Sequence, residues 1–490
     1  MKKLKQLACG LLAAALLVCA LPAAGAEGTE TPGQPAPTAC TAAEGCTLEE
    51  GHKGACNAAA SPANGPVYVA AIGEQGYETL KAALQAVPQD GTETVVTLLA
   101  DTQEVISVPG VSNPDVSNWN AVLDLNGHTL TGRISLGVIK TERVKNSTLT
   151  IQDTSPAQEG KIVGTKKDAA VWNAGSNTTV KLLSGSIIND AEPQSRGIEL
   201  AGDSSALEIH GGYVYGNQTG VYHGGGTLKM DAGAVEGASR GMFIYTNDGK
   251  AELTGGTING TKDNGSGIVI SGCASLQIGS QNASDSELQI SDLYYSRLFN
   301  SSTEVKIYSG TIEGISGEKA LVSTEILGGS FSEGVTEEML RGHVPEGSAI
   351  ISRKSGQTGT VYAVGGSAEQ LAAQAKAGDT ITVLQGDSVE VPDKVTVENK
   401  TGKDITVNGV AVPDNGTLTA HRHSAVHVAA KAPTAGQGGN IEYWYCEGCG
   451  KYFKDAALTQ ETTAEGVKLP ATGSTPAPAP TQKANPKTGM

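Results

Sequence analysis

The sequence is poor in aromatic residues, which make up only 4% of its 490 positions. Aromatic side chains supply much of the volume of a bulky globular core, so their scarcity argues against one large core of that kind. Glycine is abundant instead, with 64 residues. Together with regularly spaced Ile, Val and Leu, this much glycine indicates many tight turns between short strands.

Basic residues are also scarce relative to acidic ones, with 35 Lys and Arg against 51 Asp and Glu and a formal net charge of −16. An acidic surface repels phosphate backbones, which argues against a nucleic-acid partner. No stretch after the N-terminal region approaches the length of a transmembrane helix. We therefore expect no nucleic acid and no transmembrane span.

The N-terminus has the three parts of a secretory signal peptide, predicted over residues 1–26. Three lysines lie within the first five residues, an apolar stretch covers residues 7–21, and small residues 24–26 form the cleavage site. A lipoprotein signal acylated at Cys19 is the alternative, although Val18 precedes it where a small residue is preferred. The expected location is extracellular, either secreted or attached to a Gram-positive cell wall.

The C-terminus, residues 469–490, is a spacer rich in Pro, Ala and Thr that cannot form a packed core. Residues 469–473 read LPATG and residues 485–489 read NPKTG, and both resemble the sorting motifs that sortases recognise. Neither is followed by a hydrophobic stretch and a basic tail. The two expectations are a chain truncated after the motif, which sortase would join to peptidoglycan, and a released protein.

The middle of the chain repeats. Six segments share an alternating strand, a glycine turn and a further apolar residue: 180–187, 207–214, 228–235, 251–258, 305–312 and 324–331. Coils of about twenty residues cannot bury an apolar face alone and do so by stacking on their neighbours. Connections between parallel strands are overwhelmingly right-handed. The predicted fold is all-β, a right-handed parallel β-helix solenoid.

The side chains at one outward position of the main strand test this alignment of the repeats. From coil to coil they read Lys181, Glu208, Lys229, Glu252, Gln277, Lys306 and Glu325. Opposite charges alternate wherever neighbours are both charged, as side chains stacked across a ladder require. The inward positions are all apolar: Leu182, Ile209, Met230, Leu253, Ile278, Ile307 and Ile326.

These patterns divide the mature chain into modules. The β-helix is predicted over residues 67–365, with a small helix-containing cap at residues 67–118 that covers its open end. The same helix-then-strand pattern recurs in a small module at residues 366–420, followed by a CxxC module at residues 421–468.

Residues 123–130 (LDLNGHTL), the glycine-turn coils and residues 440–453 carry a family resemblance. The chain resembles the pectin-lyase-like surface proteins of Gram-positive gut bacteria, with a C-terminal module similar to a zinc ribbon. The resemblance covers residues 67–468 and implies the fold. It implies little about activity, because β-helices host lyases, hydrolases, adhesins and passive stalks.

The sharpest local motif is a candidate zinc site in the CxxC module. Cys446 and Cys449 form a CxxC knuckle, and three histidines precede it, His421, His423 and His427. Of these, His423 and His427 have the spacing that completes a tetrahedral zinc shell. Four protein ligands close the site, so such a zinc is structural. The alternatives are a disulfide, an idle thiol pair or redox chemistry.

A second cysteine cluster lies in the segment and linker at residues 27–66. It contains Cys40, Cys46, His52 and Cys56, which are enough ligands for a small zinc knot. Their spacing matches no established ligand pattern, and a disulfide with one free thiol is the alternative.

Catalysis on a β-helix requires clustered carboxylates. Lyases use them to hold calcium beside a basic residue, and hydrolases need two close carboxylates as acid and base. The Asp-Asp and Gly-His-Gly strings of the related hydrolases do not occur here. The candidates are His210 and Asp231 on adjacent coils, with Glu199 and Arg240, and the alternative is a solvated polar face.

Ligand binding is suggested by an apolar stripe on the outward side of the second strand of each coil. It runs Glu199, Tyr222, Phe243, Val269, Val322, with Tyr213 and Tyr215 beyond the next turn. Aromatic rings on a flat face suit sugar rings or a partner strand. The alternative is that the loop at residues 280–302 covers the stripe.

The function expected from the sequence is that of a non-enzymatic adhesin or scaffold that binds polysaccharide or a host-surface glycan or protein. One alternative is a polysaccharide lyase or glycoside hydrolase, and another is a passive structural stalk. Zinc is expected as a structural ion, and calcium only if the protein is a lyase.

Overall fold

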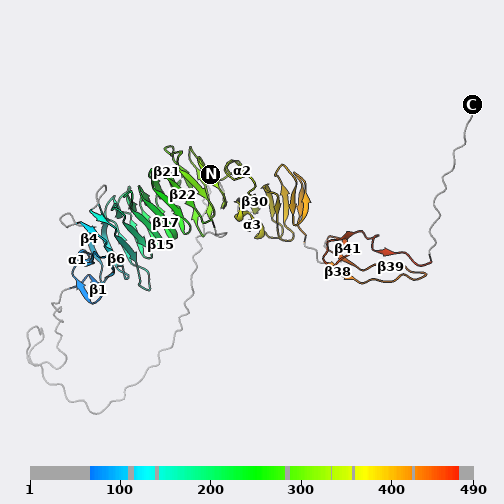
Figure 1. The fold of residues 1–490 in the computed structure, drawn as a ribbon, viewed down its shortest axis with the longest axis horizontal. Helices are drawn as coiled ribbons and strands as arrows, with labels where there is room; N and C mark the ends of the chain where they lie inside the picture. The colour runs from blue at the N-terminus through cyan, green and yellow to red at the C-terminus, as the bar shows by residue number, and fades with distance from the viewer. Residues whose placement is uncertain are drawn as a thin grey trace, which may run out of the picture. The chain divides into compact units, whose positions relative to one another are not determined.

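The computed structural model describes residues 67–108, 115–137, 143–281, 287–332, 334–355, 359–421, 425–447 and 449–473. Of the residues that the structure describes, 49% are in strands and 5% in helices, which confirms the all-β class. The largest sheet among the described residues has 32 strands, and Figure 1 shows its strands following one another along the coils. No helix in the described ranges has the length and apolar character needed to cross a membrane. The predicted signal peptide and the cluster Cys40, Cys46, His52 and Cys56 lie outside these ranges.

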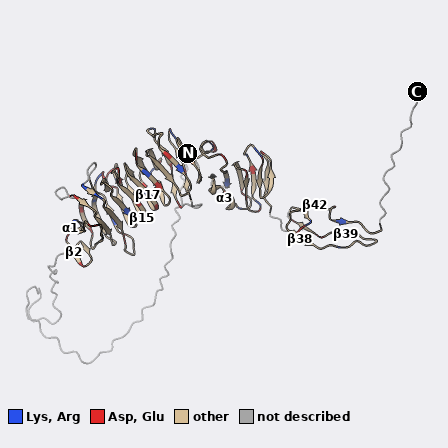
Figure 2. Ribbon diagram, in the orientation of Figure 1, with Lys and Arg blue, Asp and Glu red and all other residues tan. Residues whose placement is uncertain are grey.

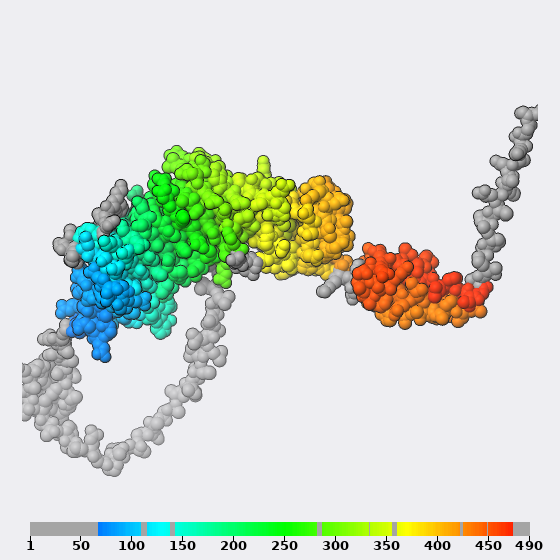
Figure 3. Space-filling model, in the orientation of Figure 1, coloured from blue at the N-terminus to red at the C-terminus, as the bar shows by residue number. Residues whose placement is uncertain are grey.

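The repeats stack as three ladders of parallel strands, one for each strand of the coil. Ladder A is formed by β3 (Glu93–Leu98), β6 (Asn120–Asp124), β9 (Thr148–Gln152), β12 (Thr179–Leu182), β15 (Ala206–Gly216), β17 (Thr227–Gly237), β19 (Lys250–Leu253), β22 (Ser275–Ile278), β25 (Glu304–Ile307) and β28 (Thr324–Ile326). Successive coils lie beside one another in chain order (Figure 3).

Ladders B and C complete each coil, and the long strands β4 (Thr102–Val108) and β7 (Thr129–Leu136) belong to both. Ladder B continues through β11 (Ala169–Asn173), β14 (Arg196–Leu200), β16 (Thr219–His223), β18 (Arg240–Tyr245), β21 (Ser266–Gly272), β24 (Leu293–Tyr295) and β27 (Ile315–Ser316). Ladder C continues through β10 (Lys161–Val163), β13 (Ser186–Asn189), the second halves of β15 and β17, β20 (Thr257–Gly260), β23 (Gln289–Ile290), β26 (Thr311–Ile312) and β29 (Gly329–Phe331).

The predicted register of ladder A is confirmed. All seven outward residues from Lys181 to Glu325 pair in the expected order from coil to coil. Figure 2 shows acidic and basic positions on the strands of the coils. Lys181 and Glu208 form an ion pair of 3.0 Å, and Lys229 and Glu252 one of 3.6 Å. Exposed pairs of this kind contribute less than about 1 kcal/mol each, so they specify the register more than they stabilise the fold. The seven inward side chains are at most 1% exposed.

One predicted strand is wrong. The sequence predicts Val322 on the outward side of the second strand of its coil, but residues 320–323 form a turn in which Leu321 and Ser323 adopt positive φ angles of 61° and 54°. The strand of ladder B in this coil is β27, a few residues earlier. Left-handed backbone is rare at leucine, so the apolar sequence gave no sign of the turn.

A second buried apolar cluster lies beyond the coils and extends from Ile351 to Ala420. It includes residues of β30 (Ile350–Ser355), β31 (Gly359–Val364), α3 (Gly366–Ala373), β32 (Thr380–Gln385) and β34 (Thr396–Asn399). Antiparallel pairs of β29 with β31 and of β30 with β32 connect these strands to the main sheet. This core therefore begins before residue 366.

Helix α1 (Leu80–Ala86) packs at the start of the coils. The Thr79 hydroxyl accepts a hydrogen bond from the backbone of Ala82, and Glu104 on β4 accepts from the backbones of Leu80 (2.7 Å) and Lys81 (3.0 Å). A carboxylate at a helix N-terminus is favourable because it meets unsatisfied N–H groups and the positive end of the helix dipole. Leu80, Ala83 and Leu84 are buried in the main core.

The turn in the LDLNGHTL segment is hydrogen-bonded to a buried carboxylate from the next coil, that of Asp153. Asp153, which is 2% exposed, accepts backbone hydrogen bonds from Gly127 (2.9 Å), Ser155 (3.0 Å) and Gly160 (2.6 Å). Burial by itself raises the pKa of Asp153, but these hydrogen bonds outweigh it and hold the pKa below its usual value. Asp153 therefore holds together the turns of two neighbouring coils in its ionised form.

His223 lies on the inward side of ladder B and is completely buried. Its Nε2 lies 3.1 Å from the carbonyl oxygen of Gly226, and its Nδ1 has no hydrogen-bond partner in the described part of the chain. Burial disfavours the charged imidazolium and lowers the pKa of His223.

We expect this histidine to make the β-helix sensitive to mild acid. Because the folded pKa lies below the unfolded value of about 6.5, its contribution is fully present above that pH and is lost as the pH falls through the folded pKa. Urea unfolding at about pH 7.5 and about pH 5 should show a smaller loss of stability for His223→Asn than for the unaltered chain. Asparagine is chosen because Asn173 occupies an equivalent inward position. The partly exposed His128→Asn is the control, and equal losses in all three proteins would contradict the prediction.

Candidate functional site

The first candidate site is the outward side of ladder B. Glu199, Tyr222, Phe243 and Val269 follow one another in register, as predicted. The next position is Tyr294, which the predicted stripe does not include. Ser316 on β27 occupies the position predicted for Val322, which lies in the turn at residues 320–323.

The aromatic residues of this side are covered by arginines. The guanidinium carbon of Arg196 lies 4.1 Å from the ring centre of Tyr222, and that of Arg240 lies 4.2 Å from the ring centre of Phe243. In such cation–π pairs the ring occupies one face of the guanidinium and the N–H groups lie at its edge. Arg196 Nε is buried and has no hydrogen-bond partner in the described part of the chain. The predicted apolar stripe is therefore a series of arginine–aromatic pairs.

The side chain of Tyr245 on this side of ladder B is exposed to solvent. It is 51% exposed and stacks on Phe243 with ring centres 5.6 Å apart and an interplanar angle of 20°. The predicted stripe does not include Tyr245, because it takes one outward residue from each coil and Tyr245 is a second one, at the end of β18. A register shift after Ile244 pairs it with Gly272 and leaves its ring exposed.

A groove of about 740 Å³ borders Tyr222 and Tyr245. Its lining also includes the polar side chains of Asp203, Asn247, Asp248 and Asn300. This volume lies in the range of ligand-binding clefts. Leu298, which is 66% exposed, and Asn300 form part of the lining, so this end of the loop at residues 280–302 borders the groove.

The charged residues that line the groove itself are Asp203 and Asp248, whereas Arg196 and Arg240 lie outside the lining on the rings of Tyr222 and Phe243. Arg196 donates to Glu199 over 2.6 Å, and Arg240 Nε donates to the Thr219 hydroxyl over 2.9 Å. Desolvation and the charge of Arg196 lower the pKa of Arg240, which indicates that the two guanidinium groups are near each other. Among the described residues, Glu199 is the one carboxylate that forms an ion pair with either of them.

The other two predicted binding residues lie on a different ladder. Tyr213 and Tyr215 belong to ladder C, where the Tyr213 hydroxyl donates to Glu236 over 2.9 Å. They do not extend the arginine–aromatic series of ladder B.

The predicted contact between His210 and Asp231 is present. His210 Nδ1 lies 2.8 Å from Asp231 Oδ2, and its Nε2 lies 3.4 Å from Glu208 Oε2. Desolvation opposes ionisation of Glu208, but Lys181 and His210 outweigh it and lower the pKa. His210 and Lys181 also line a groove of about 470 Å³ along ladder A. The structure thus brings together two of the four catalytic candidates, while Glu199 and Arg240 belong to ladder B.

The third candidate is a metal centre in the C-terminal module. A four-stranded antiparallel sheet contains β38 (Ala425–Val428), β40 (Tyr443–Cys446), β41 (Lys451–Phe453) and β42 (Glu461–Thr462). The turn after Cys446 is closed by Gly450, which has a φ angle of +71° and donates its N–H to the Cys446 carbonyl over 2.8 Å. This knuckle brings Cys449 back towards Cys446.

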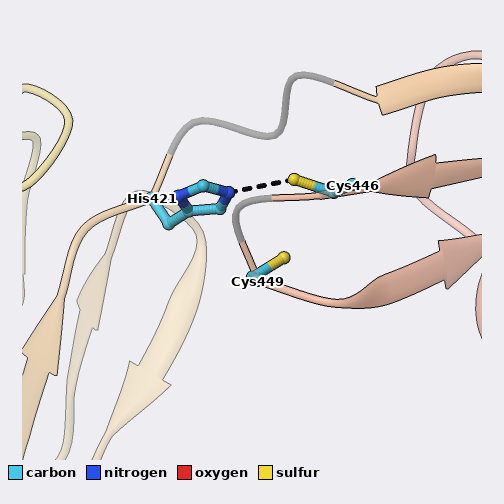
Figure 4. Close-up of side chains that lie close together, drawn as sticks. All are labelled: His421, Cys446 and Cys449. Atoms are coloured by element: carbon cyan, nitrogen blue, oxygen red, sulfur yellow. Dashed lines mark hydrogen bonds between the residues drawn. The ribbon is translucent and has the colours of Figure 1, made fainter.

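The histidine that meets the two thiols is His421. Its Nε2 lies 3.0 Å from Cys446 Sγ, and the ligand atoms of His421, Cys446 and Cys449 all lie within 4.8 Å of one another (Figure 4). The Nδ1 of His421 lies 3.7 Å from Asp393 Oδ1. One imidazole nitrogen and two thiolates form the kind of donor set that zinc prefers, so the residues present fit that ion.

The two histidines predicted as ligands have different positions. His427 Nε2 lies 2.8 Å from Glu442 Oε1, and its ring stacks on Trp444 with centres 4.9 Å apart. It is not a member of the His421 group. His423 lies outside the described residues.

No family model matches the chain, and neither a curated protein nor a solved structure does so. The resemblance to pectin-lyase-like surface proteins therefore rests on the sequence motifs alone.

Proposed function

We propose that the protein is an exported, extracellular scaffold that binds glycans along ladder B of its β-helix. The observation that supports this most is the groove beside Tyr245, which two stacked arginine–aromatic pairs flank. The open tyrosine ring presents a flat apolar surface to a sugar ring, and the polar lining offers partners for sugar hydroxyl groups.

The arginines favour a glycan with acidic groups. A guanidinium edge binds carboxylate or sulfate oxygens through paired, charge-assisted hydrogen bonds. Arg196 is partly neutralised by Glu199, whereas Arg240 donates to a neutral hydroxyl and keeps its full charge. The two guanidinium groups are the candidate partners of an anion in a chain of net charge −16, and they lie next to a groove whose own charged residues, Asp203 and Asp248, are acidic.

The proposal includes the hand of the coils and an N-terminal cap on the β-helix. The coils wind right-handed as in pectin-lyase-like proteins, and α1 is part of the N-terminal cap. The cap assignment is supported by Glu104, which ties the helix to β4. Export by the signal peptide and attachment to peptidoglycan through a sorting motif would display the groove outside the cell.

A binding screen tests the function. The mature chain is immobilised and exposed to acidic and neutral polysaccharides from plant, mucin and microbial sources, with and without calcium, and released reducing ends and unsaturated sugars are measured. We expect retention of acidic glycans without new products. Retention of neutral glycans alone would contradict the arginine-based selectivity, and the absence of any retention would contradict glycan binding.

Polysaccharide cleavage is a second candidate function, favoured by the 2.8 Å contact between His210 and Asp231 beside its own groove. Asp231 orients the imidazole, which leaves Nε2 directed to the side of Glu208 as a candidate acid or base. Products in the screen that disappear in a folded His210→Ala variant would establish this reaction in place of simple binding.

We also propose that His421, Cys446 and Cys449 hold one structural zinc ion. Zinc accepts imidazole and thiolate ligands in tetrahedral structural sites, which matches the donor set of this triad. His423 stays the sequence-based prediction for a further ligand.

A further inference from the structure

The zinc triad draws its ligands from two separately packed segments of the chain. His421 directly follows Ala420, which is 3% exposed and belongs to the second apolar cluster. The N–H of Ala420 donates to Val395 (2.7 Å), and its carbonyl accepts from Lys394 (2.8 Å). The backbone at His421 is therefore fixed to the core that ends there, whereas Cys446 belongs to the sheet that begins at Ala425.

The C-terminal sheet has little apolar core of its own. In the described parts of residues 425–473, the buried apolar side chains are Cys446, Phe453 and Val467. Neither large apolar cluster includes a described residue from this segment. A segment of about 50 residues with so small a core needs a metal, disulfides or a partner for stability.

Asp393 is placed to orient the histidine of this site. It precedes Lys394, whose N–H donates to the carbonyl of Ala420, so Asp393 and His421 extend from neighbouring backbone. The carboxylate lies on the Nδ1 side of the ring, and Nε2 faces the Cys446 thiol. A carboxylate that accepts from the Nδ1–H fixes the tautomer in which Nε2 is free to bind a metal, and it makes the imidazole a stronger ligand.

From these contacts we propose that a zinc ion bound by His421, Cys446 and Cys449 joins the C-terminal sheet to the module that ends at Ala420, with Asp393 as the positioning residue. The inference rests on the zinc proposed above and adds its mechanical role. Because metal binding energy becomes folding energy in small metal-containing domains, the ion both folds the sheet and ties it to its neighbour. Loss of zinc then releases the segment after Ala420.

The test uses the full chain, purified under reducing conditions with zinc, and has three readouts. Bound metal is measured by mass spectrometry, and the zinc affinity is measured by competition with a chromogenic chelator. The connection that zinc makes between the two modules, called the joint below, is measured by the rate at which protease cuts between them. His421→Ala is compared with the matched variant His427→Ala, whose histidine pairs with Glu442 instead. We expect about one zinc per chain in the unaltered protein and in His427→Ala, little in His421→Ala, and cleavage accelerated by roughly tenfold or more when zinc is removed.

The variant Asp393→Asn distinguishes the positioning of His421 by Asp393 from the binding of zinc by His421 itself. We expect it to keep about one zinc per chain but to bind it roughly 10–100-fold more weakly. Absence of zinc from the unaltered chain would overturn both the zinc proposal and the joint. One bound zinc whose removal leaves the cleavage rate unchanged would overturn the joint alone. Unchanged affinity in Asp393→Asn, with zinc lost in His421→Ala, would overturn the positioning role.

Discussion

Replacing Asp153 with asparagine is expected to destabilise the early coils of the β-helix by about 3 kcal/mol. The carboxylate accepts from Gly127 and Ser155 through one oxygen and from Gly160 through the other. Asparagine keeps one acceptor oxygen, but it turns an NH₂ group towards the N–H of Gly160, which is left buried and unsatisfied. It also removes the charge from the two remaining hydrogen bonds, which weakens them.

The pH dependence gives an independent check on Asp153. Its folded pKa is lowered, so its contribution is present above the unfolded value of about 3.9 and is lost as the pH falls through the folded pKa. Unfolding in urea is monitored by hydrogen exchange in strands β6 and β9. When the pH is lowered through this acid range, the free energy of unfolding should fall less in the variant than in the unaltered chain. Asp190→Asn, an exposed aspartate near a turn of another coil, is the matched control. A difference below about 1 kcal/mol between the two variants would contradict the role of Asp153.

The register of ladder A could be predicted because two requirements act on every strand with the same period of two. The inward residues must be apolar, and the outward residues must be compatible with their neighbours in the ladder. A shift by one residue would have exchanged Lys181 and Leu182 between surface and core, so the correct alignment was distinguishable. Parallel pairing follows from the same repeat.

The site could be predicted only in part because its details depend on local departures from the repeat. Tyr222 and Phe243 were found by taking one outward residue from each coil, but that pattern leaves out Tyr245 at the strand end, where a register shift exposes its ring. His421 meets Cys446 through the position of the module end at Ala420, which the spacing of a CxxC motif does not report. Spacing alone favoured His427, whose contact with Glu442 depends on the sheet that the segment forms.

Substituting the two arginines of ladder B should remove binding of acidic glycans while the fold persists. We expect Arg240→Gln to weaken binding by roughly tenfold to a hundredfold, since a charge-assisted hydrogen bond contributes about 1.5–3 kcal/mol and 1.4 kcal/mol is tenfold in affinity. Arg196→Gln should have the smaller effect because Glu199 already pairs with that guanidinium. Tyr245→Ala should weaken acidic and neutral glycans alike, because it removes the stacking surface. Isothermal titration at two salt concentrations measures each affinity and its electrostatic part.

Arg133→Gln is the matched control because it repeats the arrangement elsewhere on ladder B. The Arg133 guanidinium lies 5.1 Å from the ring centre of Trp172 and pairs with Asp168 over 3.3 Å. Trp172 does not line the groove beside Tyr245, whereas Tyr222 under Arg196 lines it and Phe243 under Arg240 stacks on Tyr245. If affinity comes from the groove, Arg133→Gln should bind as the unaltered chain does, and the salt dependence should fall only in the Arg240 and Arg196 variants. If Arg133→Gln instead weakened binding as much as Arg240→Gln, attraction would arise from the charge of the whole ladder, and the groove beside Tyr245 would not be the site.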